Sequence, residues 1–100
     1  MVEVDFKGYL KEQGEYIGKY YSIGKVLGLN AINDIIKWAK AVERVFNVNL
    51  DEVVEAGSEV TIDLLRRIQF SYEVGEKQKE NYSGAVEAYF VFVNGYELTE

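Results

Sequence analysis

Any chemistry in this 100-residue chain has to come from carboxylates, amines, guanidinium groups, phenols and hydroxyls, because histidine and cysteine are absent. The chain therefore has no imidazole base, no thiolate nucleophile and no zinc site built from the usual ligands. Carboxylates, amines and phenols ordinarily titrate far from neutrality unless burial or a neighbouring charge shifts them. No ordered set of these groups matches a known catalytic pattern. The sequence predicts a protein that is not an enzyme and that holds no cofactor.

An acidic run between residues 51 and 63 is the feature closest to a metal site. It consists of Asp51, Glu52, Glu55, Glu59 and Asp63. A calcium-binding loop needs acidic residues two apart around a central glycine, and this run has neither feature. We therefore expect a solvated acidic surface here and no metal site.

Arg66 is the candidate contact for an anionic ligand, because it interrupts an otherwise apolar series at the even positions from 60 to 74. A guanidinium group that points inward needs a buried carboxylate or an anion as its partner. The same residue could instead turn outward beside Arg67 at a bulge. We favour the outward position and keep Arg66 as a candidate ligand or anion contact.

Tyrosine supplies eight of the aromatic residues, against one tryptophan. Three of them, Tyr16, Tyr20 and Tyr21, form a cluster in the sequence. Exposed tyrosines are frequent in protein interfaces because they bury a large area at modest entropy cost. We keep this cluster as a candidate interface, with core filling as the alternative. Trp38 lies on the apolar side of a predicted helix, where we expect it to be in the core.

The N-terminal quarter of the chain predicts two strands. Apolar residues at even positions alternate with charged ones; they are Val2, Val4, Phe6 and Leu10. That two-residue period is typical of a strand with one buried face. Residues 15–23 would return as a second strand after a turn at Gly14. A helix over 15–28 stays open, although Gly18 and Gly24 each weaken a helix by about 1 kcal/mol relative to alanine.

Two helices are predicted in the middle of the chain. Residues 30–46 place apolar side chains at helical spacing and charged ones on the remaining surface. Residues 50–56 form a shorter predicted helix, with Asn49 as its N-cap and Gly57 at its C-terminal end.

The C-terminal part predicts a long hairpin. Residues 59–74 alternate between polar and apolar, with one break at Leu65 and Arg66. A helix over 58–69 also fits and stays open, but a continuous helix would contain Gly57. Residues 85–93 are predicted as a strand that is apolar on both faces, followed by a turn at Asn94-Gly95.

Together these elements predict one α+β domain over residues 1–100. An antiparallel sheet of four to five strands would pack on the main helix at 30–46, with the short helix at 50–56 and the long C-terminal hairpin. One main helix can cover only one face of such a sheet, which leaves Tyr89, Val91 and Val93 on the other. Exposing them forgoes several kcal/mol, at about 25 cal/mol per Å² of apolar surface. A second copy would cover them, so we expect a homo-oligomer.

The charge distribution limits the partners. Residues 1–50 carry seven basic and six acidic side chains, whereas residues 51–100 carry four basic and eleven acidic ones. The chain therefore has no basic footprint for nucleic acid, and no apolar run near the roughly 20 residues that span a membrane. The N-terminus lacks the apolar stretch of a signal peptide, so we expect a cytoplasmic protein. The function expected is non-catalytic protein–protein interaction or assembly, of a small viral or accessory type.

Two other functions stay open. A small-ligand-binding or enzymatic domain would enclose a pocket between sheet and helix, with Asp63, Arg66 and tyrosines such as Tyr72 inside it. An acidic inhibitor or decoy of a nucleic-acid-binding protein would instead need the carboxylates of 51–63 and 73–87 to align on one surface.

Overall fold

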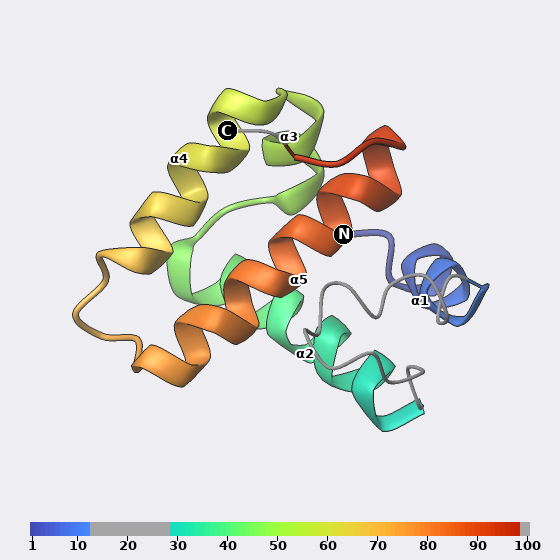
Figure 1. Ribbon diagram of the computed structural model, residues 1–100, viewed down its shortest axis with the longest axis horizontal. Coiled ribbons are helices and arrows are strands. Elements are labelled where there is room, and N and C mark those ends of the chain that lie inside the picture. The colour runs from blue at the N-terminus through green and yellow to red at the C-terminus, as the bar shows by residue number, and fades with distance from the viewer. Residues whose placement is uncertain (13–28, 99–100) are drawn as a thin grey trace.

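The computed structural model describes residues 1–12 and 29–98, and its regular elements over these residues are five α-helices with no strand (Figure 1). They are α1 (Glu3–Glu12), α2 (Leu29–Phe46), α3 (Leu50–Glu55), α4 (Ser58–Gln69) and α5 (Glu76–Asn94). The predicted α+β fold is therefore wrong, because the described residues contain no sheet on which a helix could pack. The described part of the chain is a small all-helical fold.

Helix α5 is the centre of this fold, and it replaces the strand that the sequence predicts at 85–93. The predicted strand at 85–93 lies inside α5, and α1, α2, α3 and α4 all pack against this helix. Its buried residues are Tyr82, Ala85, Val86, Ala88, Tyr89 and Phe90. A helix enclosed by other helices is apolar on most of its sides, so it shows the same two-sided apolar character as a fully buried strand. Gly95, at φ 80°, ends α5 as a left-handed cap and does not form a hairpin turn.

The long strand predicted at 59–74 is also wrong, and the helical alternative over 58–69 is confirmed by α4. The residues of α4 that are buried are Thr61, Leu64 and Ile68, at the spacing of a helix. Gly57 does not interrupt a helix, because it separates α3 from α4 and has a φ of 110°, which favours glycine. The Thr61 hydroxyl donates a hydrogen bond of 2.9 Å to the Gly57 carbonyl, which satisfies this buried polar group.

Residues 3–12 form α1 and not the predicted strand. Phe6 and Leu10 are fully buried one helical turn apart, whereas Val4 is exposed. The apolar residues of this segment fit both the two-residue period of a strand and the spacing of a helix. In the folded chain, Phe6 and Leu10 are the pair that enters the core. The return strand predicted at 15–23, with Tyr16, Tyr20 and Tyr21, lies outside the described residues.

The predictions for the two middle helices are confirmed. Helix α2 begins at Leu29 and ends at Phe46, and its apolar residues Ile32, Ile35, Ala39 and Val42 are buried. In α3 the side chain of Asn49 accepts a hydrogen bond from the backbone N–H of Glu52, as the N-cap prediction required. These segments were predictable because the apolar stripe of each helix and the N-cap of α3 are local features.

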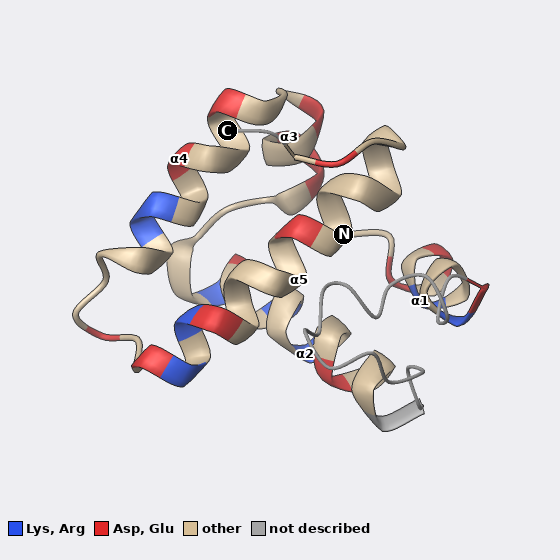
Figure 2. Ribbon diagram, in the orientation of Figure 1, with Lys and Arg blue, Asp and Glu red and all other residues tan. Residues whose placement is uncertain are grey.

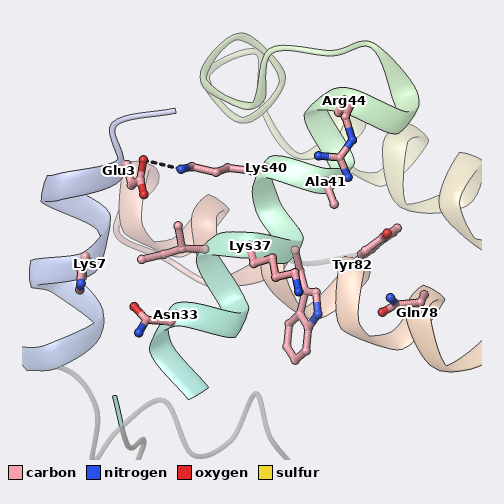
Figure 3. Close-up of a pocket in the computed structure, with 11 residues that line it drawn as sticks. Glu3, Lys7, Asn33, Lys37, Lys40, Ala41, Arg44, Gln78 and Tyr82 are labelled. Carbon is pink, nitrogen blue, oxygen red and sulfur yellow. Dashed lines mark ion pairs between the residues drawn. The ribbon is translucent and has the colours of Figure 1, made fainter. Parts of the chain in front are cut away.

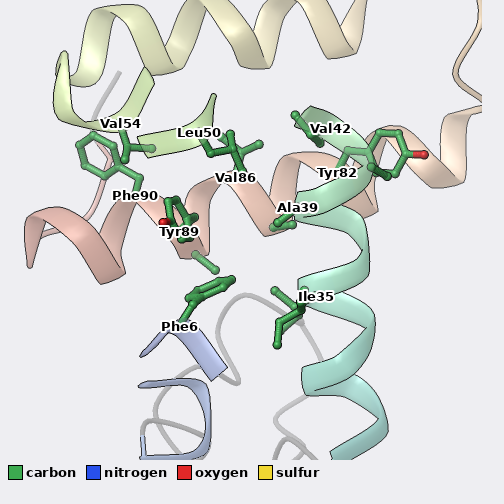
Figure 4. Packing of buried hydrophobic residues seen from close by; sticks show 14 of the residues in the cluster. Phe6, Ile35, Ala39, Val42, Leu50, Val54, Tyr82, Val86, Tyr89 and Phe90 are labelled. Carbon is green, nitrogen blue, oxygen red and sulfur yellow. The ribbon is translucent and has the colours of Figure 1, made fainter. Parts of the chain in front are cut away.

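One cluster of apolar side chains forms the core between the helices (Figure 4). At one end of it the ring of Phe6 from α1 meets the ring of Tyr89 edge-on, with 4.9 Å between the ring centres. At the other end Val54 of α3 lies beside Phe90 of α5 (Figure 4). The Asn94 side-chain amide joins these two helices by donating a hydrogen bond of 3.1 Å to the Val54 carbonyl. The core thus positions α1 and α2 against one side of α5, and α3 and α4 against the other (Figure 1).

Candidate functional site

A hollow of about 480 Å³ opens between α1, α2 and α5, and we call it the basic groove (Figure 3). Helix α1 contributes Glu3 and Lys7, and α5 contributes Gln78 and Tyr82. The remaining lining residues come from α2: Asn33, Ile36, Lys37, Trp38, Lys40, Ala41 and Arg44. Three helices that are far apart in the sequence therefore build one concave surface.

The charge of the basic groove opposes that of the chain as a whole. Its lining includes four cationic side chains, those of Lys7, Lys37, Lys40 and Arg44, and one carboxylate, that of Glu3, for a net charge of +3. The whole chain carries −6, so the residues outside the groove carry −9. Lys40 pairs with Glu3 at 2.7 Å, and the other three cations have no ion-pair partner within the described ranges.

The cationic side of α2 follows from its local sequence. Lys37, Lys40 and Arg44 are spaced i, i+3 and i+7, which places them along one side of the helix. The buried apolar residues of α2 hold another side against α5. Burial of the apolar side thus presents the cationic side to solvent, and the fold adds Lys7 to it from α1 (Figure 3).

Trp38 gives the groove an apolar surface as well. It was predicted in the core, but it is only partly buried and it lines the groove beside Lys37. An indole can cover the methylene groups of a bound side chain or lie against a planar group. The groove therefore combines cationic groups with a flat apolar surface.

Of the residues predicted as an interface, the structure describes Tyr89, Val91 and Val93. Tyr89 is fully buried in the core, so it presents no surface to a partner, and Val91 and Val93 are partly buried on the same helix. The uncovered sheet face that suggested them does not exist. Tyr16, Tyr20 and Tyr21 lie outside the described residues.

Arg66 lies on the surface of α4, as the favoured outward position required, although no bulge is present. Its guanidinium group is 3.5 Å from Asp63, one turn earlier, and both side chains are largely exposed. A shallow hollow of about 460 Å³ beside Arg66 is lined also by Leu65, Phe70 and Glu87. The pocket between sheet and helix that Arg66, Asp63 and Tyr72 were expected to line has no counterpart here, because the described residues contain no sheet and Tyr72 is fully exposed.

A second group of polar residues lies where the start of the chain meets α2, α3 and α5, and we call it the Tyr89 network. The Tyr89 hydroxyl donates to Asp51 and accepts from the backbone N–H of Val2 at 3.0 Å. The Met1 ammonium lies 2.9 Å from Asp51 and 3.5 Å from Glu43. Glu43 also accepts a hydrogen bond of 3.0 Å from the backbone N–H of Leu50.

The electrostatics of the Tyr89 network indicate a structural role. Burial, and then the hydrogen bond to Asp51, raise the pKa of Tyr89 well above its ordinary value. Burial alone would raise the pKa of Asp51, but the Tyr89 hydroxyl and the Met1 ammonium outweigh it and the pKa is lowered. The hydrogen bond to Asp51 raises the pKa of the Met1 ammonium despite its burial. These interactions favour a charged Met1 ammonium, an ionised Asp51 and a neutral Tyr89 hydroxyl. We therefore conclude that the network stabilises the fold.

Sequence reasoning missed the basic groove. A signal is present in the i, i+3, i+7 cations next to Trp38, but the sequence does not show that Lys7 of α1 lies beside them. No group of three or more acidic side chains among the described residues could hold a metal ion. Within the same residues, no helix has both the length and the apolar character that crossing a membrane requires.

The chain has no significant match to a protein-family model, a curated protein or a solved structure.

Proposed function

We propose that this protein is a non-catalytic interaction protein whose basic groove binds an acidic segment of a protein partner. The observation that supports the proposal is the net charge of +3 in a concave surface, within a chain whose remaining residues carry −9. Unpaired cations in a concave site attract an anionic partner and raise its rate of association.

The chemistry of the groove suits carboxylates. The Arg44 guanidinium can donate two parallel hydrogen bonds to one carboxylate, and Lys7 and Lys37 provide further positive charges around it. Trp38 can cover the methylene groups of a glutamate side chain. An acidic peptide segment therefore finds both a charge partner and an apolar contact.

A nucleic acid is a poorer candidate for the same groove. Duplex DNA carries a negative charge about every 1.7 Å along its axis, so it would extend beyond the groove onto the acidic remainder of the protein. A short acidic segment can begin and end within the groove. The distribution of charge thus favours a protein partner.

The lining residues also favour binding over catalysis. Glu3 is the carboxylate of the groove, and the ammonium group of Lys40 holds it at 2.7 Å. One carboxylate in a half-exposed ion pair, with no nucleophile placed beside it among the lining residues, does not make up an acid–base site. We place the interaction in the cytoplasm, because a chain without cysteine needs no oxidising compartment to fold.

Tryptophan fluorescence tests the proposal, because Trp38 is the only tryptophan and it lines the groove. We expect a short poly-glutamate peptide to change the emission saturably at about 50 mM salt and to lose this effect at about 500 mM. A poly-glutamine peptide of the same length is the control peptide.

Charge-reversed variants locate the binding site. Arg44→Glu should abolish binding of the poly-glutamate peptide, whereas Arg66→Glu makes the same charge change outside the groove and should retain it. Loss of binding in both variants, or in neither, would contradict the proposed site. Circular dichroism of each variant checks that the helices are intact.

A further inference from the structure

We propose that the acidic segment is supplied by a second copy of this chain, through a surface formed by α3 and the first half of α4. This inference rests on the proposed function and names its partner. The surface, which we call the acidic ridge, presents four exposed carboxylates: Glu52, Glu55, Glu59 and Asp63. The association is head to tail, with the ridge of one copy in the basic groove of the next.

The acidic ridge complements the groove in charge. Glu52, Glu55 and Glu59 have no ion-pair partner within residues 1–12 and 29–98, whereas Asp63 pairs with Arg66. The four carboxylates and Arg66 together carry −3, against +3 in the groove. Each surface is therefore left with charge that the other can neutralise.

The ridge also carries an apolar side chain that matches the apolar part of the groove. Val60 lies between Glu59 and Asp63 on α4 and is 42% exposed, which is high for a valine in a folded chain. Trp38 gives the groove its flat apolar surface. Contact between these two residues would remove apolar surface from water on both copies.

The two surfaces cannot meet within one molecule. The ridge lies on α3 and the first half of α4, whose acidic segments Figure 2 shows, whereas the groove is lined by residues of α1, α2 and α5. The central helix α5 packs against all of these helices and fixes this separation. Neutralisation of the ridge by the groove therefore requires a second copy.

This contact differs in symmetry from a two-fold dimer, which is the simplest form of the homo-oligomer expected from the sequence. The surfaces that meet are different, so the interface is heterologous, and each pair of copies keeps one unused groove and one unused ridge. Such a contact continues into a ring or an open chain. Because exposed charges dominate it, ions screen it over about 8 Å at physiological salt and the association is salt-sensitive.

Sedimentation velocity over a range of protein concentrations provides the test. At about 50 mM salt we expect an average mass that rises with concentration above the 11.4 kDa monomer, and at about 500 mM the monomer alone. The groove variant Lys37→Gln/Arg44→Gln and the ridge variant Glu55→Gln/Glu59→Gln should each be monomeric at low salt. Helix content by circular dichroism confirms that both variants are folded.

Mixing the two variants distinguishes a heterologous contact from a two-fold one. Each variant keeps one intact surface, so an equimolar mixture should form a 1:1 dimer and nothing larger. A mixture that stays monomeric, or a wild-type chain that is monomeric at every concentration at low salt, would overturn the inference. A monomeric wild-type chain that still binds poly-glutamate in the groove overturns the second-copy inference alone, whereas failure to bind poly-glutamate overturns the proposed function.

Discussion

The Tyr89 network and the basic groove both contain charged residues from several helices. The charges of the network are paired with one another, whereas most of those in the groove are not. In the network, Asp51 is hydrogen-bonded by Tyr89 and paired with the Met1 ammonium. In the groove, Lys7, Lys37 and Arg44 have no such partners among the described residues. Polar groups that satisfy one another stabilise the fold, whereas those left unpaired can contribute binding energy to a ligand. Substitutions should therefore affect stability in one region and binding in the other.

The largest expected effect is on the Tyr89 network. Tyr89→Phe removes the hydroxyl that serves both Val2 and Asp51, so it should lower the free energy of unfolding by about 1–3 kcal/mol. The matched control is Tyr72→Phe, which removes a fully exposed hydroxyl and should have an effect within about 0.5 kcal/mol. Urea unfolding of both variants measures the difference. Equal effects would remove the distinction between a structural network and an accessible surface.

A smaller effect appears in the pH dependence of stability. The pKa of Asp51 is lower in the folded chain than its ordinary value of 3.8, so its ionised form stabilises the fold. This contribution is present above the unfolded pKa and is lost as the pH falls through the folded pKa. We expect Asp51→Asn to flatten the decline in stability below about pH 4, measured by thermal unfolding between neutral and acid pH. If the stability of this variant declined below about pH 4 as steeply as that of the wild type, the role assigned to Asp51 would be contradicted.

The smallest effect on stability is expected in the groove, together with a gain in binding. Glu3→Gln breaks the ion pair with Lys40, whose partly exposed groups contribute less than about 1 kcal/mol. The substitution also raises the net charge of the groove from +3 to +4, so the poly-glutamate peptide should bind more tightly. Trp38 fluorescence measures the affinity and urea unfolding the stability. Weaker binding would show that Glu3 does not oppose the ligand.

The success of the sequence predictions differed between helices for a physical reason. In α2 and α3 the apolar residues recur at one period, and α3 also has a local N-cap at Asn49, so those helices were predicted with nearly their observed bounds. In α1 and α4 the apolar residues fit both a strand and a helix, and packing selected the helix. In α5 the segment 85–93 packs among the other helices and contains one charged residue, Glu87, so it shows too little polar character to indicate a helical period.

The candidate site was predictable only in part. Lys37, Lys40 and Arg44 share one side of α2, and this follows from helical geometry alone. The contribution of Lys7 does not, because nothing near it in the sequence indicates that α1 lies beside α2. The sequence predicts Tyr89 in an interface because it predicts a strand at 85–93. Its burial depends on the central position of α5.

By itself, the sequence determined the available chemistry, with no imidazole or thiol, and the two helices whose apolar and charged residues separate onto different sides. It also determined that the second half of the chain would be acidic. The tertiary structure decided which residues meet across long separations, such as Tyr89 with Asp51, 38 positions apart, and with Val2, 87 positions apart. The reason is that helical hydrogen bonds and side-chain neighbours join residues only three or four positions apart. The groove and the network instead depend on how the helices pack around α5.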